Sequence, residues 1–166
     1  MRSKQSSMKL KLIFLFTCFT MSIVAQHSPL KKIEALINGQ CIGSPSDRSA
    51  QKQLVRFSVL DKDSVELAAE THELSSGSVL RKNRFHFRLT DIDADHVVIK
   101  QFGSFYGVFL YTKEHKKQIV QSVFLAGDPN ASNYSQEMVC ICDFKDIQTA
   151  EELKAELIKA ITLHKP

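Results

Sequence analysis

The run MVCICDFKDIQTAEELKAELIKAI (residues 138–161) determines how the fold must end, because an apolar, strand-like segment passes directly into an amphipathic helix. Over 149–163, apolar residues recur at helical spacing and charged residues fill the positions between them. We expect Thr149 to cap this helix, with Glu152 completing a capping box. The apolar side of the helix needs a surface to cover, so the preceding chain should supply a sheet.

A second helix is predicted near the start of the domain, in the run SPLKKIEALING. Ser28 is a good N-cap and Pro29 suits the first helical position. Apolar residues then fall on one face, and Asn38–Gly39 is a typical stop signal. These features predict a helix over 29–38.

Alternation of apolar and polar residues predicts about seven strands within residues 53–144. The clearest are LVRFSVL (54–60) and SVELAAE (64–70), which the DKD turn should join into a hairpin. Short polar turns separate neighbouring strands, so we expect mainly antiparallel pairing. The polar runs 44–53 and 127–136 are predicted loops. The expected fold class is α+β, with an N-terminal helix, about seven strands in a barrel or sandwich, and a C-terminal amphipathic helix.

The first 25 residues have the pattern of a secretory signal peptide. Four basic residues precede the apolar run LIFLFTCFTMSIVA (12–25), which ends in a small residue. This run is short for a membrane span, which needs about 20 residues, and no similar run follows it. We therefore expect residues 26–166 to be one exported domain, secreted or periplasmic, with no transmembrane helix. Lipidation at Cys18 and an uncleaved anchor are the alternatives.

The charge balance argues against nucleic-acid binding. The leader carries four of the 22 basic residues and none of the 18 acidic ones, so the remaining chain has 18 of each. A nucleic-acid-binding domain usually keeps a basic footprint. The formal charge of +4 therefore belongs to the leader, and no nucleic-acid partner is expected.

Three segments together resemble the second half of a pleckstrin-homology-like (PH-like) barrel: FHFRLTDIDADHVVIK (85–100), GVFLYTKEHKKQIVQ (107–121) and ICDFKDIQTAEELKAELIKAI (141–161). The resemblance covers roughly residues 84–163. It implies two packed sheets with the C-terminal helix closing one open corner, and a binding scaffold more than an enzyme. The C-terminal pattern is also similar to that of small uncharacterised exported proteins of Bacteroidetes type. A profilin-like or other α+β sandwich fits the same order of elements.

Three cysteines remain after the leader, in a compartment where disulfides persist. Cys140 and Cys142 should share one face of a strand, roughly 6.5–7 Å apart, which is at the limit for a bridge. We therefore expect Cys41 to pair with either Cys140 or Cys142, leaving one thiol buried or free. The alternative is a soft-metal site for Cu(I) with the ligands Met138, Cys140 and Cys142.

The run RKNRFHFR is the only local basic cluster. Three of its side chains should share one face of a strand and are the expected ligand-binding residues: Arg84, His86 and Arg88. Such a face can bind phosphate groups or acidic partners. The alternative is a solvated face whose charges are balanced by Glu66 and Glu70 across the sheet. Loop 127–136 is the second candidate surface.

The chain lacks recognisable catalytic and cofactor motifs. It has no P-loop, no H-E-x-x-H and no G-x-G-x-x-G. GSFYG (103–107) lacks the nucleophile-elbow spacing and should instead give a turn and a close backbone approach. DIDADH (91–96) has His96 and Phe102 where a calcium loop needs Gly and Glu, so we expect a tight turn held by Asp side chains.

The function expected from these patterns is an exported, non-enzymatic binding or envelope-associated module. It would act on an unidentified protein or envelope partner and use no cofactor, and no feature of the sequence indicates a particular oligomeric state. Two alternatives remain. One is a small exported enzyme that uses Cys41 or a histidine, and the other is a carrier of copper.

Overall fold

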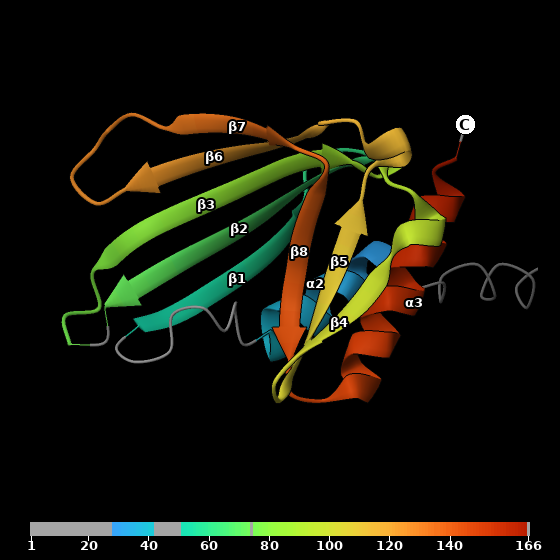
Figure 1. Ribbon diagram of the computed structural model, residues 1–166, viewed down its shortest axis with the longest axis horizontal. Helices are drawn as coiled ribbons and strands as arrows, with labels where there is room; N and C mark the ends of the chain where they lie inside the picture. Colours follow the sequence, from blue (N-terminus) through green and yellow to red (C-terminus); the bar gives the residue numbers. More distant parts are fainter. Residues whose placement is uncertain (1–27, 42–50, 74, 166) are drawn as a thin grey trace, which may run out of the picture.

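The computed structural model describes residues 28–41, 51–73 and 75–165. The predicted leader, residues 1–25, and most of the predicted loop 44–53 lie outside the described residues. Within the described part, two antiparallel sheets and two helices form an α+β sandwich (Figure 1). The predicted fold class is therefore confirmed.

Within the described residues, a helix is both the first and the last element of regular structure, and all the strands lie between the two helices. The helices are α2 (Pro29–Gln40) and α3 (Ile147–Leu163). The described residues form eight strands where about seven were predicted: β1 (Gln51–Val59), β2 (Ser64–Glu73), β3 (Val79–Arg88), β4 (Val98–Phe102), β5 (Phe105–Tyr111), β6 (Ile119–Leu125), β7 (Ser132–Gln136) and β8 (Met138–Phe144). Three short 3-10 helices connect them: η1 (Leu89–Asp91), η2 (Ala94–His96) and η3 (Lys113–His115).

The chain passes back and forth between the two sheets. The larger sheet has the order β1-β2-β3-β6-β7, and the smaller has the order β4-β5-β8. The chain crosses between them after β3, after β5 and after β7, so β3 pairs with β6 and β5 pairs with β8. Helix α3 packs against the smaller sheet, and α2 packs between α3 and β1 (Figure 1).

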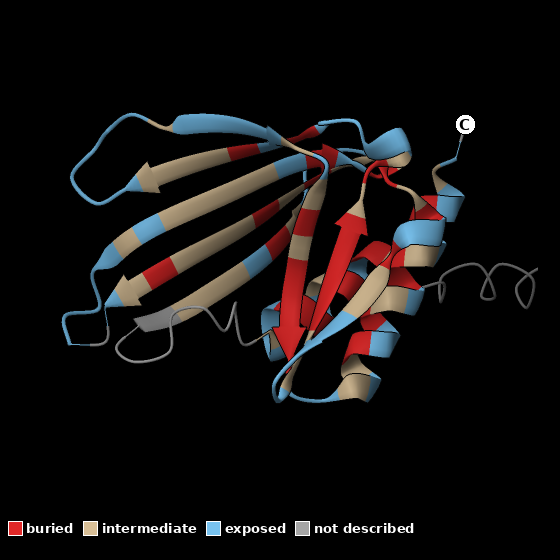
Figure 2. Cartoon of the chain, in the orientation of Figure 1, coloured by how far each residue is buried: buried red, intermediate tan, exposed pale blue. Residues whose placement is uncertain are grey.

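The core lies where the helices and the smaller sheet meet one half of the larger sheet. Figure 2 shows buried residues concentrated there, whereas the distal ends of β2, β3 and β6 are mostly intermediate or exposed. The predicted apolar faces of both helices are buried, as are alternate residues of the strands. These residues include Leu30, Ile33, Leu36 and Ile37 of α2, Leu153, Leu157, Ala160 and Ile161 of α3, and Phe57, Val65, Leu67 and Phe87 of the larger sheet. The distal half of the larger sheet therefore projects beyond the core.

The predicted capping box of the last helix is wrong. Helix α3 begins at Ile147, and its N-cap is Asp146, whose carboxylate accepts hydrogen bonds from the backbone N–H groups of Gln148 and Thr149. Thr149 lies inside the helix, and its hydroxyl also bonds to Asp146, at 2.8 Å. An aspartate caps as well as a threonine does, and its charge suits the positive end of the helix dipole.

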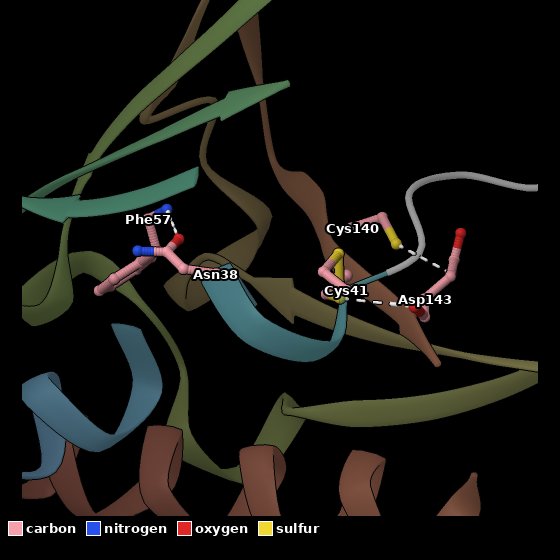
Figure 3. Close-up of a disulfide and its surroundings, with 6 residues drawn as sticks. Asn38, Cys41, Phe57, Cys140 and Asp143 are labelled. Carbon is pink, nitrogen blue, oxygen red and sulfur yellow. Dashed lines mark hydrogen bonds between the residues drawn. A yellow bond between two sulfur atoms is a disulfide. The ribbon is translucent and has the colours of Figure 1, made fainter. Parts of the chain in front are cut away.

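Helix α2 continues past the predicted stop at Asn38–Gly39 and ends at Gln40. The side chain of Asn38 does not terminate the helix. Instead, its Oδ1 accepts a hydrogen bond from the backbone N–H of Phe57 in β1, at 3.0 Å (Figure 3). A tertiary contact therefore uses the residue that the local pattern assigned to the end of the helix.

Both predicted loops overlap a strand. Ser132–Gln136 of the predicted loop 127–136 form β7, which pairs with β6 at one edge of the larger sheet. Residues 51–53 of the predicted loop 44–53 belong to β1. The predicted Asp-held turn is confirmed, because Oδ1 of Asp93 accepts a hydrogen bond from the backbone N–H of Asp95 at 3.0 Å.

Candidate functional site

The larger sheet has one face directed away from the core, which we call the outer face. Its β3 side chains are Lys82, Arg84, His86 and Arg88, because alternate residues of a strand share a face and Phe87 of the opposite parity is in the core. The register sets three residues of β2 beside them: Glu70 opposite Lys82, Ala68 opposite Arg84, and Glu66 opposite His86. The predicted basic residues therefore do share one strand face.

Carboxylates from β2 pair with two of the basic groups on this face. Nζ of Lys82 lies 2.5 Å from Oε1 of Glu70, and Nε2 of His86 lies 2.8 Å from Oε2 of Glu66. The hydrogen bond from Lys82 lowers the pKa of Glu70, which is therefore ionised at neutral pH. Glu66 and Glu70 thus pair with His86 and Lys82, the basic residues on either side of Arg84, as the alternative of a charge-balanced face predicts.

Arg84 differs from its neighbours because it contacts no carboxylate among the described residues. Ala68 lies opposite it on β2 and has no acceptor to offer from its side chain. The Nε–H group of Arg84 is shielded from solvent and lacks a hydrogen-bond partner within the described chain. Its guanidinium carbon instead lies 5.7 Å from the centroid of the Phe124 ring, a cation-π arrangement. A shielded donor without an acceptor is costly, so an added hydrogen-bond acceptor at this position would be stabilising.

A pocket of about 360 Å³ opens beside Arg84, between the distal ends of β3 and β6. Its lining consists of Val79, Lys82, Arg84, Phe124, Leu125 and Ala126. Two of the apolar side chains are well exposed, Val79 at 43% and Leu125 at 56%. This end of the larger sheet lies at the left of Figure 1, away from both helices. The pocket therefore combines two cations with an apolar surface.

The predicted ligand-binding residues divide between this pocket and its surroundings. Arg84 lines the pocket, whereas His86 is paired to Glu66 and outside the lining. Arg88 is exposed at the far end of β3, about 13 Å from Arg84 at roughly 3.3 Å per residue. The second predicted surface, loop 127–136, contributes no residue to the described lining of this pocket. Ala126, the residue just before that loop, does contribute.

Two pocket residues, Lys82 and Phe124, were not predicted. Lys82 has the same parity on β3 as Arg84, so the strand alternation already contained its signal. Phe124 reaches the pocket because β6 pairs with β3 and places it opposite Lys82. In the sequence, β3 and β6 are separated by β4 and β5 of the smaller sheet, so no local sequence pattern predicts that they pair.

The structure joins Cys41 to Cys142 by a disulfide, with the two Cα atoms 5.6 Å apart (Figure 3). The bridge links the end of α2 to β8, and Cys140 is left as a free cysteine. The expectation that Cys140 and Cys142 share a strand face is wrong. A β-bulge at Ile141 sets Cys142 opposite Val108 but Cys140 opposite Phe109, which point to different faces of β5.

The bulge and the disulfide also bear on the soft-metal alternative. Cys142 is bonded to Cys41 and buried in the core, so the oxidised protein does not present the set Met138, Cys140 and Cys142 as ligands. Within the part of the chain that the structure describes, no three His, Cys, Asp or Glu side chains cluster closely enough to hold a metal ion.

The free thiol of Cys140 lies 3.6 Å from Oδ1 of Asp143, a carboxylate that is only 2% exposed (Figure 3). Burial strongly raises the pKa of the Cys140 thiol, and the neighbouring Asp143 charge raises it further. Burial also raises the pKa of Asp143. A thiol that stays protonated is a poor nucleophile, and Cys41 has no thiol while it is bridged. The geometry therefore does not favour a cysteine-based enzyme.

No protein-family model, curated protein or solved structure matches this chain. None of the described helices is both long enough and apolar enough to cross a membrane. The class that the fold and the site define is thus a small α+β sandwich with a partly basic, partly apolar pocket on the outer face of its larger sheet.

Proposed function

We propose that this chain is an exported, non-enzymatic binding module that recognises an anionic group of an extracellular or envelope partner through Arg84. The observation that carries the proposal is the state of the Arg84 guanidinium. Its Nε–H is shielded and has no acceptor among the described residues, while the basic groups on either side are paired with Glu70 and Glu66. An anion at this position would complete a charge-assisted hydrogen bond, which is stronger than a neutral one.

The paired neighbours help to define a single recognition point. Glu70 is paired with Lys82 and Glu66 with His86, and among the described residues neither carboxylate forms an ion pair with Arg84. The Phe124 ring supports the guanidinium from one side. Arg84 is thus partly pre-organised, which reduces the entropy lost when a ligand binds.

Three further observations support the proposed class of protein. The leader pattern and the Cys41–Cys142 disulfide both suit an oxidising, extracytoplasmic compartment. Two packed sheets and a C-terminal helix agree with the PH-like resemblance only in coarse architecture, and this fold-level analogy supports a binding scaffold. The protonated Cys140 and the bridged Cys41 weaken the thiol-enzyme alternative.

The proposal can be tested by titrating the ¹⁵N-labelled domain with acetate and with inorganic phosphate while following the Arg84 Nε–H and the amides of β3 and β6. We expect saturable shifts at Arg84, Lys82 and Phe124, and their loss in Arg84→Gln. Arg88→Gln is the matched control, because Arg88 is on the same strand face but outside the pocket. Equal responses of the two variants would refute the assignment to Arg84.

Export is tested separately, by the intact mass of the protein recovered from its host. Cleavage of the leader predicts a chain that begins at Gln26 and lacks lipid. A chain that keeps residues 1–25, or one with added acyl mass, would favour an anchored form over the free module.

A further inference from the structure

We propose that the pocket beside Arg84 binds an amphipathic monoanion, namely a carboxylate attached to an alkyl chain. This inference rests on the proposed function, because it assigns a ligand class to the same site. It follows from the composition of the pocket wall, from the number of unpaired charges and from the size of the space.

The pocket wall is mostly apolar. Val79, Phe124, Leu125 and Ala126 line it together with Lys82 and Arg84. Val79 and Leu125 belong to the few large apolar side chains that the structure leaves strongly exposed among the described residues. A small inorganic anion would leave this surface in water, whereas an alkyl group would cover it and gain the free energy of burying apolar surface.

The charges lining the pocket fit one negative charge. Lys82 is neutralised by Glu70 at 2.5 Å, and within the described lining Arg84 is the cation that no carboxylate balances. A dianion would bring its second charge close to Glu70, which repels it. A carboxylate carries a single charge and two acceptor oxygens, and therefore matches the guanidinium.

The dimensions fit a ligand of moderate size. A volume of about 360 Å³ lies at the lower end of the range for small-molecule pockets, roughly 300–1,000 Å³. The Phe124 ring serves two purposes here, because it contacts the guanidinium and also forms part of the apolar wall. The carboxylate and the first part of the chain can therefore bind next to each other, with the rest of the chain running toward Val79 and Leu125.

The test measures binding of four probes to the mature chain by calorimetry, below their micelle concentrations: decanoate, acetate, inorganic phosphate and decyltrimethylammonium. We expect decanoate to bind at least about tenfold more tightly than acetate or phosphate, because it alone combines the charge with apolar burial. Decyltrimethylammonium, which has an alkyl chain of similar length and the opposite charge, should show no measurable binding.

Two variants separate the contributions of charge and apolar surface. Arg84→Gln should weaken decanoate binding about tenfold or more. Phe124→Ala should weaken decanoate but leave acetate nearly unchanged. Arg88→Gln should bind decanoate as the parent protein does. Thermal unfolding of each variant checks that the fold is retained, and Phe124→Leu replaces Phe124→Ala if the latter is unstable.

The outcomes distinguish this inference from the proposed function. If acetate or phosphate binds in an Arg84-dependent way and decanoate binds no more tightly, the amphipathic ligand is wrong but anion recognition stands. If phosphate binds more tightly than decanoate, the monoanion assignment is wrong. If decanoate binds Arg84→Gln as well as the parent, both the ligand class and the Arg84 site are overturned.

Discussion

Gly107 of β5 lies directly opposite Asp143 of β8, and a Cβ atom built on Gly107 would lie 2.6 Å from Oδ1 of that aspartate. The same Cβ would lie 2.8 Å from Cε2 of Phe109. The missing side chain at position 107 thus makes room for a carboxylate that is almost wholly buried. The close backbone approach predicted in GSFYG is confirmed at Gly107. The turn predicted in the same run is confirmed at Gly103, whose φ is +60°.

Gly107→Ala is expected to lower the free energy of unfolding by about 1–3 kcal/mol, because Asp143 and Phe109 must both move to admit the methyl group. Urea denaturation measures this change. Gly39→Ala is the matched control, since nothing lies within 4 Å of its Cβ position on the exposed side of α2. The control should gain up to about 1 kcal/mol from the higher helix propensity of alanine. If Gly107→Ala were as stable as the parent, the close contact with Asp143 would be disproved.

Asp143→Asn is expected to stabilise the protein at neutral pH and to lose that advantage in acid. Burial raises the pKa of Asp143 in the folded state above its unfolded value. At a pH above both values the buried charge costs stability. As the pH falls through the folded pKa and then below the unfolded value, about 3.9, the folded carboxyl takes up its proton and the cost disappears.

The measurement is the difference in transition temperature between parent and Asp143→Asn from pH 4 to pH 8. We expect the variant to melt higher at pH 8, with the two curves converging toward pH 4. Other titrating groups are common to both proteins and cancel in the difference. A constant difference across the whole range would mean that Asp143 does not titrate as its burial predicts.

Asn38→Ala should cost about 1–3 kcal/mol of stability, because it removes the acceptor for the backbone N–H of Phe57. β1 is an edge strand of the described sheet, so on its outer side its N–H groups face no other described strand, and Asn38 of α2 supplies one acceptor. The amide of Phe57 should also exchange with solvent faster in the variant. Lys31→Ala, on the exposed side of the same helix, should change stability by less than about 0.5 kcal/mol. Unchanged exchange at Phe57 would contradict the role assigned to Asn38.

Periodicity was sufficient to predict the elements whose apolar residues face the core. Leu153 and Leu157 of α3 are buried at helical spacing, and Val65 and Leu67 of β2 are buried at strand spacing. The start of α3 was less predictable, because Asp146 and Thr149 are both good caps three residues apart. The structure uses Asp146, which intrinsic capping preference favours, whereas the capping-box spacing of Thr149 and Glu152 indicated Thr149.

Elements without an apolar face were missed for a physical reason. The residues of β7 are polar and mostly exposed, since this short strand pairs with β6 at an edge and covers no core. Its backbone pairing therefore leaves no mark in the hydrophobic pattern.

The candidate site was predictable only within one strand. Arg84, His86 and Arg88 share a face because of strand parity, which the sequence shows directly. The pocket also needs Phe124, which β6 contributes through a long-range pairing. The bulge at Ile141 similarly reverses the side on which Cys140 lies, and a single inserted residue of this kind has no sequence signature.

The Cys41–Cys142 disulfide is expected to contribute about 2–5 kcal/mol of stability. It connects residues 101 positions apart, and in the chain-entropy model a loop of that length restricts the unfolded state by about 4–5 kcal/mol. Reduction of the parent, or the double change Cys41→Ser and Cys142→Ser, should lower the free energy of unfolding by a similar amount in urea. Cys140→Ser is the matched control, because it removes the thiol and keeps the bridge.

Alkylation followed by intact mass determination assigns the three cysteines of residues 26–166. Without reductant, Cys140 should react slowly in the folded protein, because it is partly buried and burial raises its pKa. It should react fully once the chain is unfolded. One alkyl group in denaturant therefore indicates one bridge, and peptide mapping should find it on Cys140. Three alkyl groups without reductant would show that no bridge forms, and reduction should then leave the stability unchanged. A single group on Cys142 instead would mean that Cys41 pairs with Cys140, which the opposite facing of the two β8 cysteines disfavours.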